Sequence, residues 1–253
     1  ELNGIWVGKF ELTGDTTNPT IKPNVESLRN ENVSTLFATT QKLSTNSSML
    51  KNIEWGAITY LTTSIYGQGL NEVRINNSST YITGCAASVE NGVSYNGCEN
   101  EYYKSIGYLA STTGNISGIY DMSGGAWEYV MGVMEDSLNS NVPASGYNTQ
   151  YNSGFSGKNL IDGTTTTGVS FPESKYYDIY KYGTSSGDNT RYHLGDATTE
   201  TKGWNGDYAY FVGSSYPWFA RGGYGYGTNA GVFAFYNIDG LAHSSYSARA
   251  ILR

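Results

Sequence analysis

Few residue types in this chain of 253 residues are placed to do covalent chemistry. Gly183, Ser185 and Gly187 form the G-x-S-x-G pattern, which holds a serine nucleophile on a sharp turn between a strand and a helix. The flanking sequences, YKY and DNTRYH, predict neither element. His193 and His243 are the only two histidines that could serve as a base. The pattern is therefore interpreted as a coincidence, and no catalytic residue is assigned.

Signatures of cofactors and metals are equally weak. Gly225, Gly227 and Ala230 fit G-x-G-x-x-A, but no strand–helix–strand unit surrounds them to bind a dinucleotide. The two histidines and two cysteines do not cluster, so they form no zinc signature. No metal ligands and no cofactor are expected, although a structural calcium ion is left open.

The two cysteines, Cys85 and Cys98, flank the polar loop AASVENGVSYNG. A disulfide between them would close that loop and contribute about 3 kcal/mol to stability. The alternative is two unrelated free thiols. A protein that works outside the cytoplasm would favour the disulfide.

Composition narrows the class of partner. The net charge is −7, and the 15 Lys and Arg residues form no runs, so nucleic acid is not expected to bind. No apolar run approaches the roughly 20 residues that span a bilayer. The chain begins without Met, so an export or anchoring segment ahead of residue 1 stays open. With 32 Gly and 23 Tyr, the composition favours a loop-rich fold held together by aromatic rings.

The elements that must position any site are clearest near the start of the chain. Alternation over residues 4–14 predicts an opening strand with Trp6, Phe10 and Leu12 on one face. Residues 32–43 carry apolar side chains at helical spacing, which predicts a first amphipathic helix.

A second helix is predicted within residues 52–67, with Asn52 as its N-cap and a buried face formed by Trp55, Ile58, Leu61 and Ile65. Beyond residue 70 the pattern changes to short aromatic pieces between polar clusters, and residues 137–168 are expected to form a long surface excursion. No linker divides the chain, so residues 1–253 are predicted to form one domain.

Four segments, taken in order, resemble one family. NISGIYDMSGGAWEYV is similar to the signature of the formylglycine-generating-enzyme branch of the C-type lectin fold. IWVGKFELTG resembles the opening strand of that family, IEWGAITYL its second helix, and WFARGG with SARAIL its closing elements. The resemblance implies an α+β fold of small antiparallel sheets, two helices and much irregular loop. WNGD at 204–207 also resembles the calcium-binding tripeptide of sugar-binding C-type lectins, but an inserted glycine makes that function unfavoured.

The resemblance assigns structural roles to the central and closing motifs. Glycines 124 and 125 would turn the backbone sharply so that Trp127 enters the core. Glu128 would then be a buried acid, and it needs a partner because an unpaired buried charge is very costly. Arg221 and Arg249 are the two candidates for the partner of Glu128.

The catalytic chemistry of the formylglycine-generating enzymes does not carry over. Their cysteine pair follows the RGG element, whereas no cysteine follows Arg221 here, so the thiol nucleophile is missing and no enzyme is predicted. The closing segment instead resembles the variable proteins of diversity-generating retroelements, with GTNAGVFAF and SARA matching their framework. This implies a variable ligand-binding region at about 221–249.

In that class, mutated adenines turn Asn codons into codons for Tyr, Ser, Asp, His or Gly, among others, but never Lys, Glu, Gln, Met or Trp. None of those five types occurs between residues 222 and 248. A glycine-rich aromatic loop that lacks them by chance is the alternative. The resemblance implies a non-catalytic receptor-recognition protein on a bacterial surface or a phage virion, with a macromolecular ligand, expected to be a protein.

Val232, Phe233 and Phe235 are expected to face inward. The residues expected to face the ligand are large, stiff aromatic rings and small polar side chains, as in antibody paratopes: Tyr224, Gly225, Tyr226, Tyr236, Ile238, Asp239, Leu241, His243, Ser244, Ser245 and Tyr246. Two other functions stay open. One is an enzyme of the same superfamily with divergent chemistry, and the other is a phage-tail or surface adhesin whose closing segment is fixed.

Overall fold

The largest sheet is built around the long strand β7 (Trp127–Asp136), in a computed structural model that describes residues 4–86, 97–136, 139–143, 153–158, 165–166, 168–180, 193–213, 216–224 and 227–253. β7 pairs antiparallel with β12 (Trp218–Gly222), which pairs antiparallel with β13 (Gly231–Ile238). β11 (Asp178–Tyr180) and β14 (Tyr246–Ala248) both run parallel to β7, and β8 (Asn139–Pro143) pairs with its end.

A second sheet joins the beginning of the chain to its end. β1 (Trp6–Val7) pairs antiparallel with β15 (Ala250–Leu252), which also pairs with β4 (Ser47–Met49). Three further two-stranded ladders are short: β2 (Thr13–Gly14) with β3 (Pro19–Thr20), β5 (Cys85–Ala86) with β6 (Asn100–Glu101), and β9 (Gly157–Lys158) with β10 (Thr165–Thr166).

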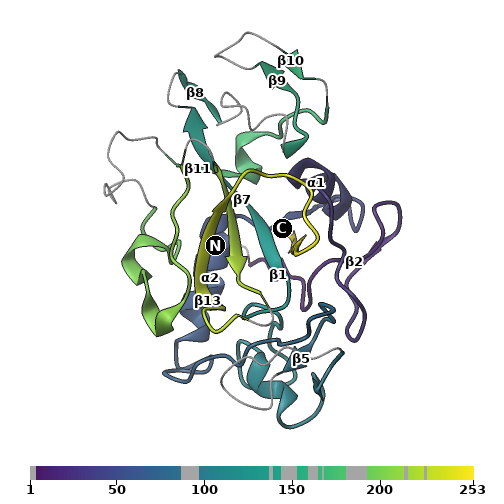
Figure 1. Cartoon of the computed structure of the whole chain (residues 1–253), viewed down its shortest axis with the longest axis vertical. Helices are drawn as coiled ribbons and strands as arrows, with labels where there is room; N and C mark the ends of the chain where they lie inside the picture. Colours follow the sequence, from purple (N-terminus) through teal and green to yellow (C-terminus); the bar gives the residue numbers. More distant parts are fainter. Residues whose placement is uncertain are drawn as a thin grey trace.

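Both predicted helices are present. α1 (Val33–Thr40) begins where the side chain of Asn32 accepts a hydrogen bond from Thr35 N at 2.9 Å. α2 (Asn52–Thr62) lies behind the central sheet in the view of Figure 1. Trp55 of α2 is fully buried and donates its indole N–H to the Val232 carbonyl at 2.9 Å, so the helix is fixed to β13.

Two details of the second helix differ from the prediction. The cap is Lys51, whose backbone N–H donates to Glu54 at 2.8 Å, and Asn52 is the first helical residue. Leu61 and Ile65 are 60% and 91% exposed rather than buried. Leu61 lies within the helix but away from its buried face, and Ile65 lies beyond the end of the helix at Thr62.

The opening segment is not one strand. β1 and β2 belong to different sheets, and Trp6 is 78% exposed while Phe10 and Leu12 are buried. Gly8 and Leu12 donate backbone hydrogen bonds to the carbonyls of Ala250 and Ala248, so this segment runs beside residues 248–250. Its alternating apolar residues therefore lie in two different environments.

The structure is therefore α+β, with two helices and several small sheets in its described part, as the sequence predicts at this level. The predicted surface excursion is partly wrong, because Phe155 is buried against Phe37 and Trp218. No helix within the described ranges is long and apolar enough to cross a membrane.

Candidate functional site

The turn before β7 positions the centre of the site. Gly124 and Gly125 adopt φ values of 77° and 73°, which side chains disfavour. A Cβ atom on Gly124 would lie 2.4 Å from the Asn76 carbonyl oxygen, so the close approach also requires glycine. The turn carries Trp127 into the interior, where it is 1% exposed, as the sequence predicts.

Glu128 pairs with Arg249, one of the two partners left open by the sequence. The two side chains are fully buried and form two hydrogen bonds, of which the one from Arg249 Nε to Glu128 Oε2 is 3.0 Å long. The guanidinium also donates to the carbonyls of Gly8 and Tyr120 at 2.7 and 2.8 Å. Burial raises the pKa of Glu128, and the charge of Arg249 opposes that rise.

Arg221, the other partner considered, has a different role. Its guanidinium donates to Asn52 Oδ1 at 2.8 Å and to the carbonyls of Asp196 and Ala197 at 3.1 and 2.9 Å. Burial lowers the pKa of Arg221 to about 10, so the side chain stays charged at neutral pH. It therefore holds α2 and the 196–197 segment to β12, a structural role.

An aromatic cluster surrounds Trp127. Four tyrosine rings have their centroids within contact range of the indole: Tyr236 at 5.5 Å, Tyr208 at 5.7 Å, Tyr224 at 5.8 Å and Tyr246 at 6.3 Å. Tyr210 packs at 5.5 Å against Tyr236, and Tyr129 at 5.0 Å against Tyr246. Ala220 of β12 pairs with Tyr129 of β7 on one side and with Tyr236 of β13 on the other. Because its side chain is small, space remains for these rings.

The cluster has a buried side and an exposed side. Tyr210 is 55% exposed, whereas Tyr208, Tyr224 and Tyr236 are half-buried. The prediction that Tyr246 faces a ligand is wrong, because this residue is 2% exposed. As part of β14 it pairs with β7, so its ring lies against Trp127 and Tyr129, with His243 at 4.9 Å on its outer edge.

The other expected ligand-facing residues lie mostly at the surface. Leu241, His243 and Ser244 are exposed, and Ile238, Asp239 and Ser245 are half-buried. Gly225 and Tyr226 lie outside the described residues. The three residues expected to face inward, Val232, Phe233 and Phe235, are buried. Along β13 the inward Phe235 is followed directly by the outward Tyr236.

Sequence reasoning missed Tyr208 and Tyr210. Their segment runs beside β13, where Tyr210 N donates to the Phe235 carbonyl at 3.0 Å and Phe235 N donates to the Tyr208 carbonyl at 2.9 Å. The alternation in DYAY was the available signal, since period two places both rings on one side of an extended chain.

The structure joins Cys85 and Cys98 in a disulfide, with their Cα atoms 5.2 Å apart. The bridge ties β5 to the segment just before β6. Of the two alternatives left open by the sequence, the disulfide is therefore correct.

The motifs that suggested chemistry are not assembled into a catalytic site within the described part of the chain. Gly183, Ser185 and Gly187 lie outside it. His193 makes a 2.7 Å hydrogen bond through Nε2 to the Ile179 carbonyl, and His243 lies at the aromatic cluster. No group of three His, Cys, Asp or Glu side chains that could hold a metal occurs among the residues the structure places.

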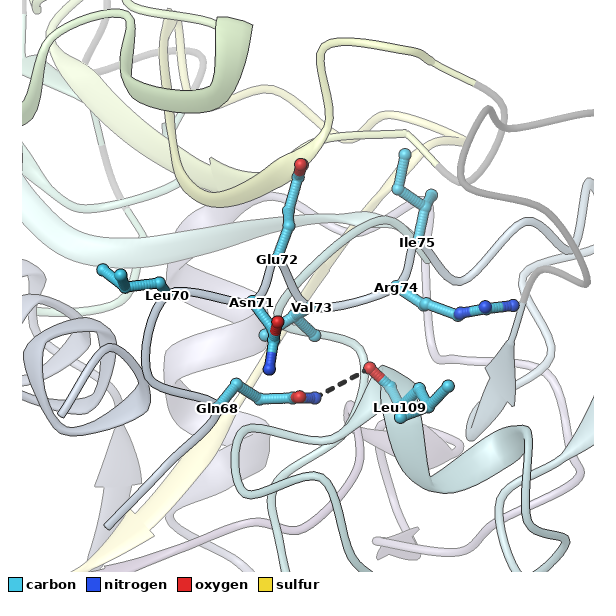
Figure 2. A pocket seen from close by; sticks show the side chains of 8 residues that line it. All are labelled: Gln68, Leu70, Asn71, Glu72, Val73, Arg74, Ile75 and Leu109. Carbon is cyan, nitrogen blue, oxygen red and sulfur yellow. Dashed lines mark hydrogen bonds between the residues drawn. The ribbon is translucent and has the colours of Figure 1, made fainter. Parts of the chain in front are cut away.

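One pocket of about 510 Å³ lies beside residues 68–75 (Figure 2). Its lining joins amide, charged and aliphatic side chains: Gln68, Leu70, Asn71, Glu72, Val73, Arg74, Ile75 and Leu109. The amide of Gln68 donates to the Leu109 carbonyl at 3.0 Å, as the dashed line in Figure 2 shows. The one carboxylate in the lining is that of Glu72.

Comparison with known protein families finds none that matches the chain, and comparison with curated proteins finds no similar sequence.

Proposed function

We propose that this chain is a non-catalytic binding protein with a C-type lectin fold of the formylglycine-generating-enzyme type, whose closing segment is diversified by a retroelement. It binds a macromolecule, expected to be a protein, through the exposed side of the aromatic cluster and the adjoining 238–245 segment. It works outside the cell, on a bacterial surface or a phage virion. The disulfide fits an oxidising compartment.

The convergence of the resembling segments supports the proposed fold. The WEYV motif forms the start of β7, the WFARGG motif contains β12, and SARAIL spans β14 and β15. β12 and β14 both pair with β7, while β15 pairs with β1 from the opening motif. Segments that are distant in sequence thus pair with one another in the sheets. This is expected if the segments that resemble the family belong to one domain of that fold.

The observation that carries the proposed function is the division of the closing segment into a buried and an exposed set. Phe233 and Phe235 pack inside, whereas Tyr236, Leu241 and Ser244 reach the surface. Surface positions on a rigid scaffold can change without unfolding the domain. Tyrosines at such positions provide large contact areas at a low cost in conformational entropy.

Sequencing the gene with its flanks, together with sibling genes, tests this proposal. We expect a reverse transcriptase gene, a near-identical template repeat, and substitutions at Asn-derived codons for residues 224, 236, 238, 239, 241 and 243–245. Phe233, Phe235 and Arg249 should stay constant, and so should Tyr246 because it is buried. A locus without a repeat or a reverse transcriptase would overturn the retroelement part and leave a fixed adhesin.

A further inference from the structure

The closing part of the chain has an unusual charge distribution. Between residues 203 and 248 the only Lys or Arg is Arg221, while the carboxylates are Asp207 and Asp239. Arg221 is fully buried and donates to groups on α2 and the 196–197 segment. The surface formed by this stretch therefore presents tyrosine rings and acid without a lysine or arginine of its own.

The exposed rings stand edge to face. Tyr210 meets Tyr236 at an interplanar angle of 76°, and Tyr208 meets Tyr236 at 70°. Ring faces carry the negative end of the aromatic quadrupole, so they attract cations. Tyr210, at 55% exposure, is the ring most open to an incoming group.

A negative charge lies in the segment that follows Tyr236. Asp239 follows β13, three residues beyond Tyr236, and one of its carboxylate oxygens accepts a hydrogen bond from Leu241 N at 3.0 Å. A carboxylate has about four acceptor sites, so this bond leaves capacity for a donor from a partner. The segment that carries Asp239 reaches the aromatic cluster, because the Tyr129 hydroxyl donates to the Leu241 carbonyl at 2.8 Å and the His243 ring lies 4.9 Å from the ring of Tyr246.

The border of the same surface already holds one guanidinium against a tyrosine. Arg29 lies 4.3 Å from the ring centroid of Tyr81, whose hydroxyl donates to Ser245 at 3.1 Å. Arg29 also donates to the Ser244 carbonyl and pairs with Glu26 at 3.3 Å. This bordering cation is thus neutralised within the chain, and it shows the type of contact that the surface favours.

We propose that the partner presents a basic segment to this surface, with arginine or lysine side chains stacked on Tyr210 and Tyr236 and paired with Asp239. The inference rests on the proposed function, because it names the chemistry of the partner for the same surface. A phosphate-rich or acidic partner would meet the Asp239 carboxylate and no exposed lysine or arginine from residues 203–248. An apolar partner would leave the Asp239 carboxylate to be desolvated without a counter-charge.

Selection from a random peptide library displayed on phage tests the inference. The disulfide-bonded protein is immobilised, bound peptides are sequenced, and affinities of synthetic peptides are measured by fluorescence polarisation at two salt concentrations. We expect enrichment of Arg and Lys. Tyr210→Ser and Asp239→Asn should each weaken binding by about tenfold, since each removes one favourable contact with the cation.

Matched controls separate specific contacts from general attraction to an acidic protein. Tyr103→Ser removes an exposed tyrosine from the 97–104 segment, and Glu173→Gln removes one exposed negative charge, as Asp239→Asn does. Both controls should leave affinity unchanged. Equal losses in Glu173→Gln and Asp239→Asn would overturn the inference.

The remaining outcomes distinguish the two proposals. Peptides that depend on Tyr210 but carry no Arg or Lys would overturn the basic partner and leave the binding surface in place. If no selected peptide depends on Tyr210, Tyr236 or Asp239, both the basic partner and the proposed binding surface fail. Thermal melts of each variant establish that the compared proteins are folded.

Discussion

At the scale of single residues, Tyr210 and Tyr246 belong to one aromatic cluster but differ in what they do there. Tyr246 is almost fully buried between Trp127 and Tyr129, whereas more than half of Tyr210 is exposed. The buried ring stabilises the framework, and the exposed ring is available to a ligand.

Replacing each ring by serine measures this difference. Tyr246→Ser should lower the free energy of unfolding by about 3–5 kcal/mol, because it leaves a cavity and buries a hydroxyl beside two large rings. Tyr210→Ser should cost about 1 kcal/mol or less. Urea unfolding followed by fluorescence compares them, and equal losses in the two variants would contradict the division.

Asp207 is a second residue whose environment determines its behaviour. Its side chain is buried, and its Oδ2 accepts a hydrogen bond from Phe233 N at 3.0 Å. Burial, followed by the negative charge of Glu72, raises the pKa of Asp207 to about 7 from an ordinary value of 3.8.

Because the folded-state pKa is raised, the protonated carboxyl stabilises the fold at low pH, and this contribution is lost as the pH rises from about 4 through 7. Asp207→Asn removes the dependence while keeping the side-chain shape. We compare the free energies of unfolding of Asp207→Asn and of the native protein. The variant's advantage should increase by on the order of a few kcal/mol between pH 5 and pH 8, because only the native protein loses stability over this range. Urea titrations at the two pH values check this, and an unchanged difference would contradict the raised pKa.

At the scale of elements, the Glu128–Arg249 pair connects β7 to the junction of β14 and β15. β14 and β15 have only three residues each, so few ladder hydrogen bonds hold this part of the chain. The buried pair, with its extra bonds to the Gly8 and Tyr120 carbonyls, joins the opening segment, the central turn and the end of the chain.

Glu128→Gln removes the carboxylate that is hydrogen-bonded to the buried guanidinium and leaves only Asp121 and Glu11 to oppose its charge, so it should lower the free energy of unfolding by about 3–5 kcal/mol. The matched control is Glu54→Gln, which breaks the partly exposed pair between Glu54 and Arg253. That change should cost about 1 kcal/mol or less. Chemical denaturation of both variants measures the two costs, and similar values would contradict a structural role for the buried pair.

How far the sequence predicts each element depends on whether its cause is local. The helix α1 is predictable because its whole apolar face lies within a dozen residues. Tyr246 was misplaced because β14 gains its partner from β7, more than 100 residues earlier, and a three-residue strand carries little pattern of its own. Leu61 and Ile65 follow helical spacing, yet Leu61 lies outside the buried face of α2 and Ile65 lies beyond its end, and spacing alone does not show which residues of a helix meet the core.

At the scale of the whole molecule, the disulfide ties β5 to the segment just before β6. Cys85 and Cys98 are 13 residues apart, so the bridge restricts a modest loop in the unfolded chain. The double variant Cys85→Ser/Cys98→Ser should lose about 3 kcal/mol of stability. A thermal melt under oxidising and reducing conditions measures this. The native protein should fall to the level of the variant on reduction, and insensitivity to reductant would contradict a stabilising bridge.

The antiparallel pairing of β1 with β15 places Trp6 directly opposite Leu252, on neighbouring strands that lie about 5 Å apart. Residues 6 and 252 can therefore serve as two adjacent attachment points through which the polypeptide between them is inserted into a loop of a host protein. The tyrosine surface lies wholly within that stretch, so such an insertion would keep it in one piece.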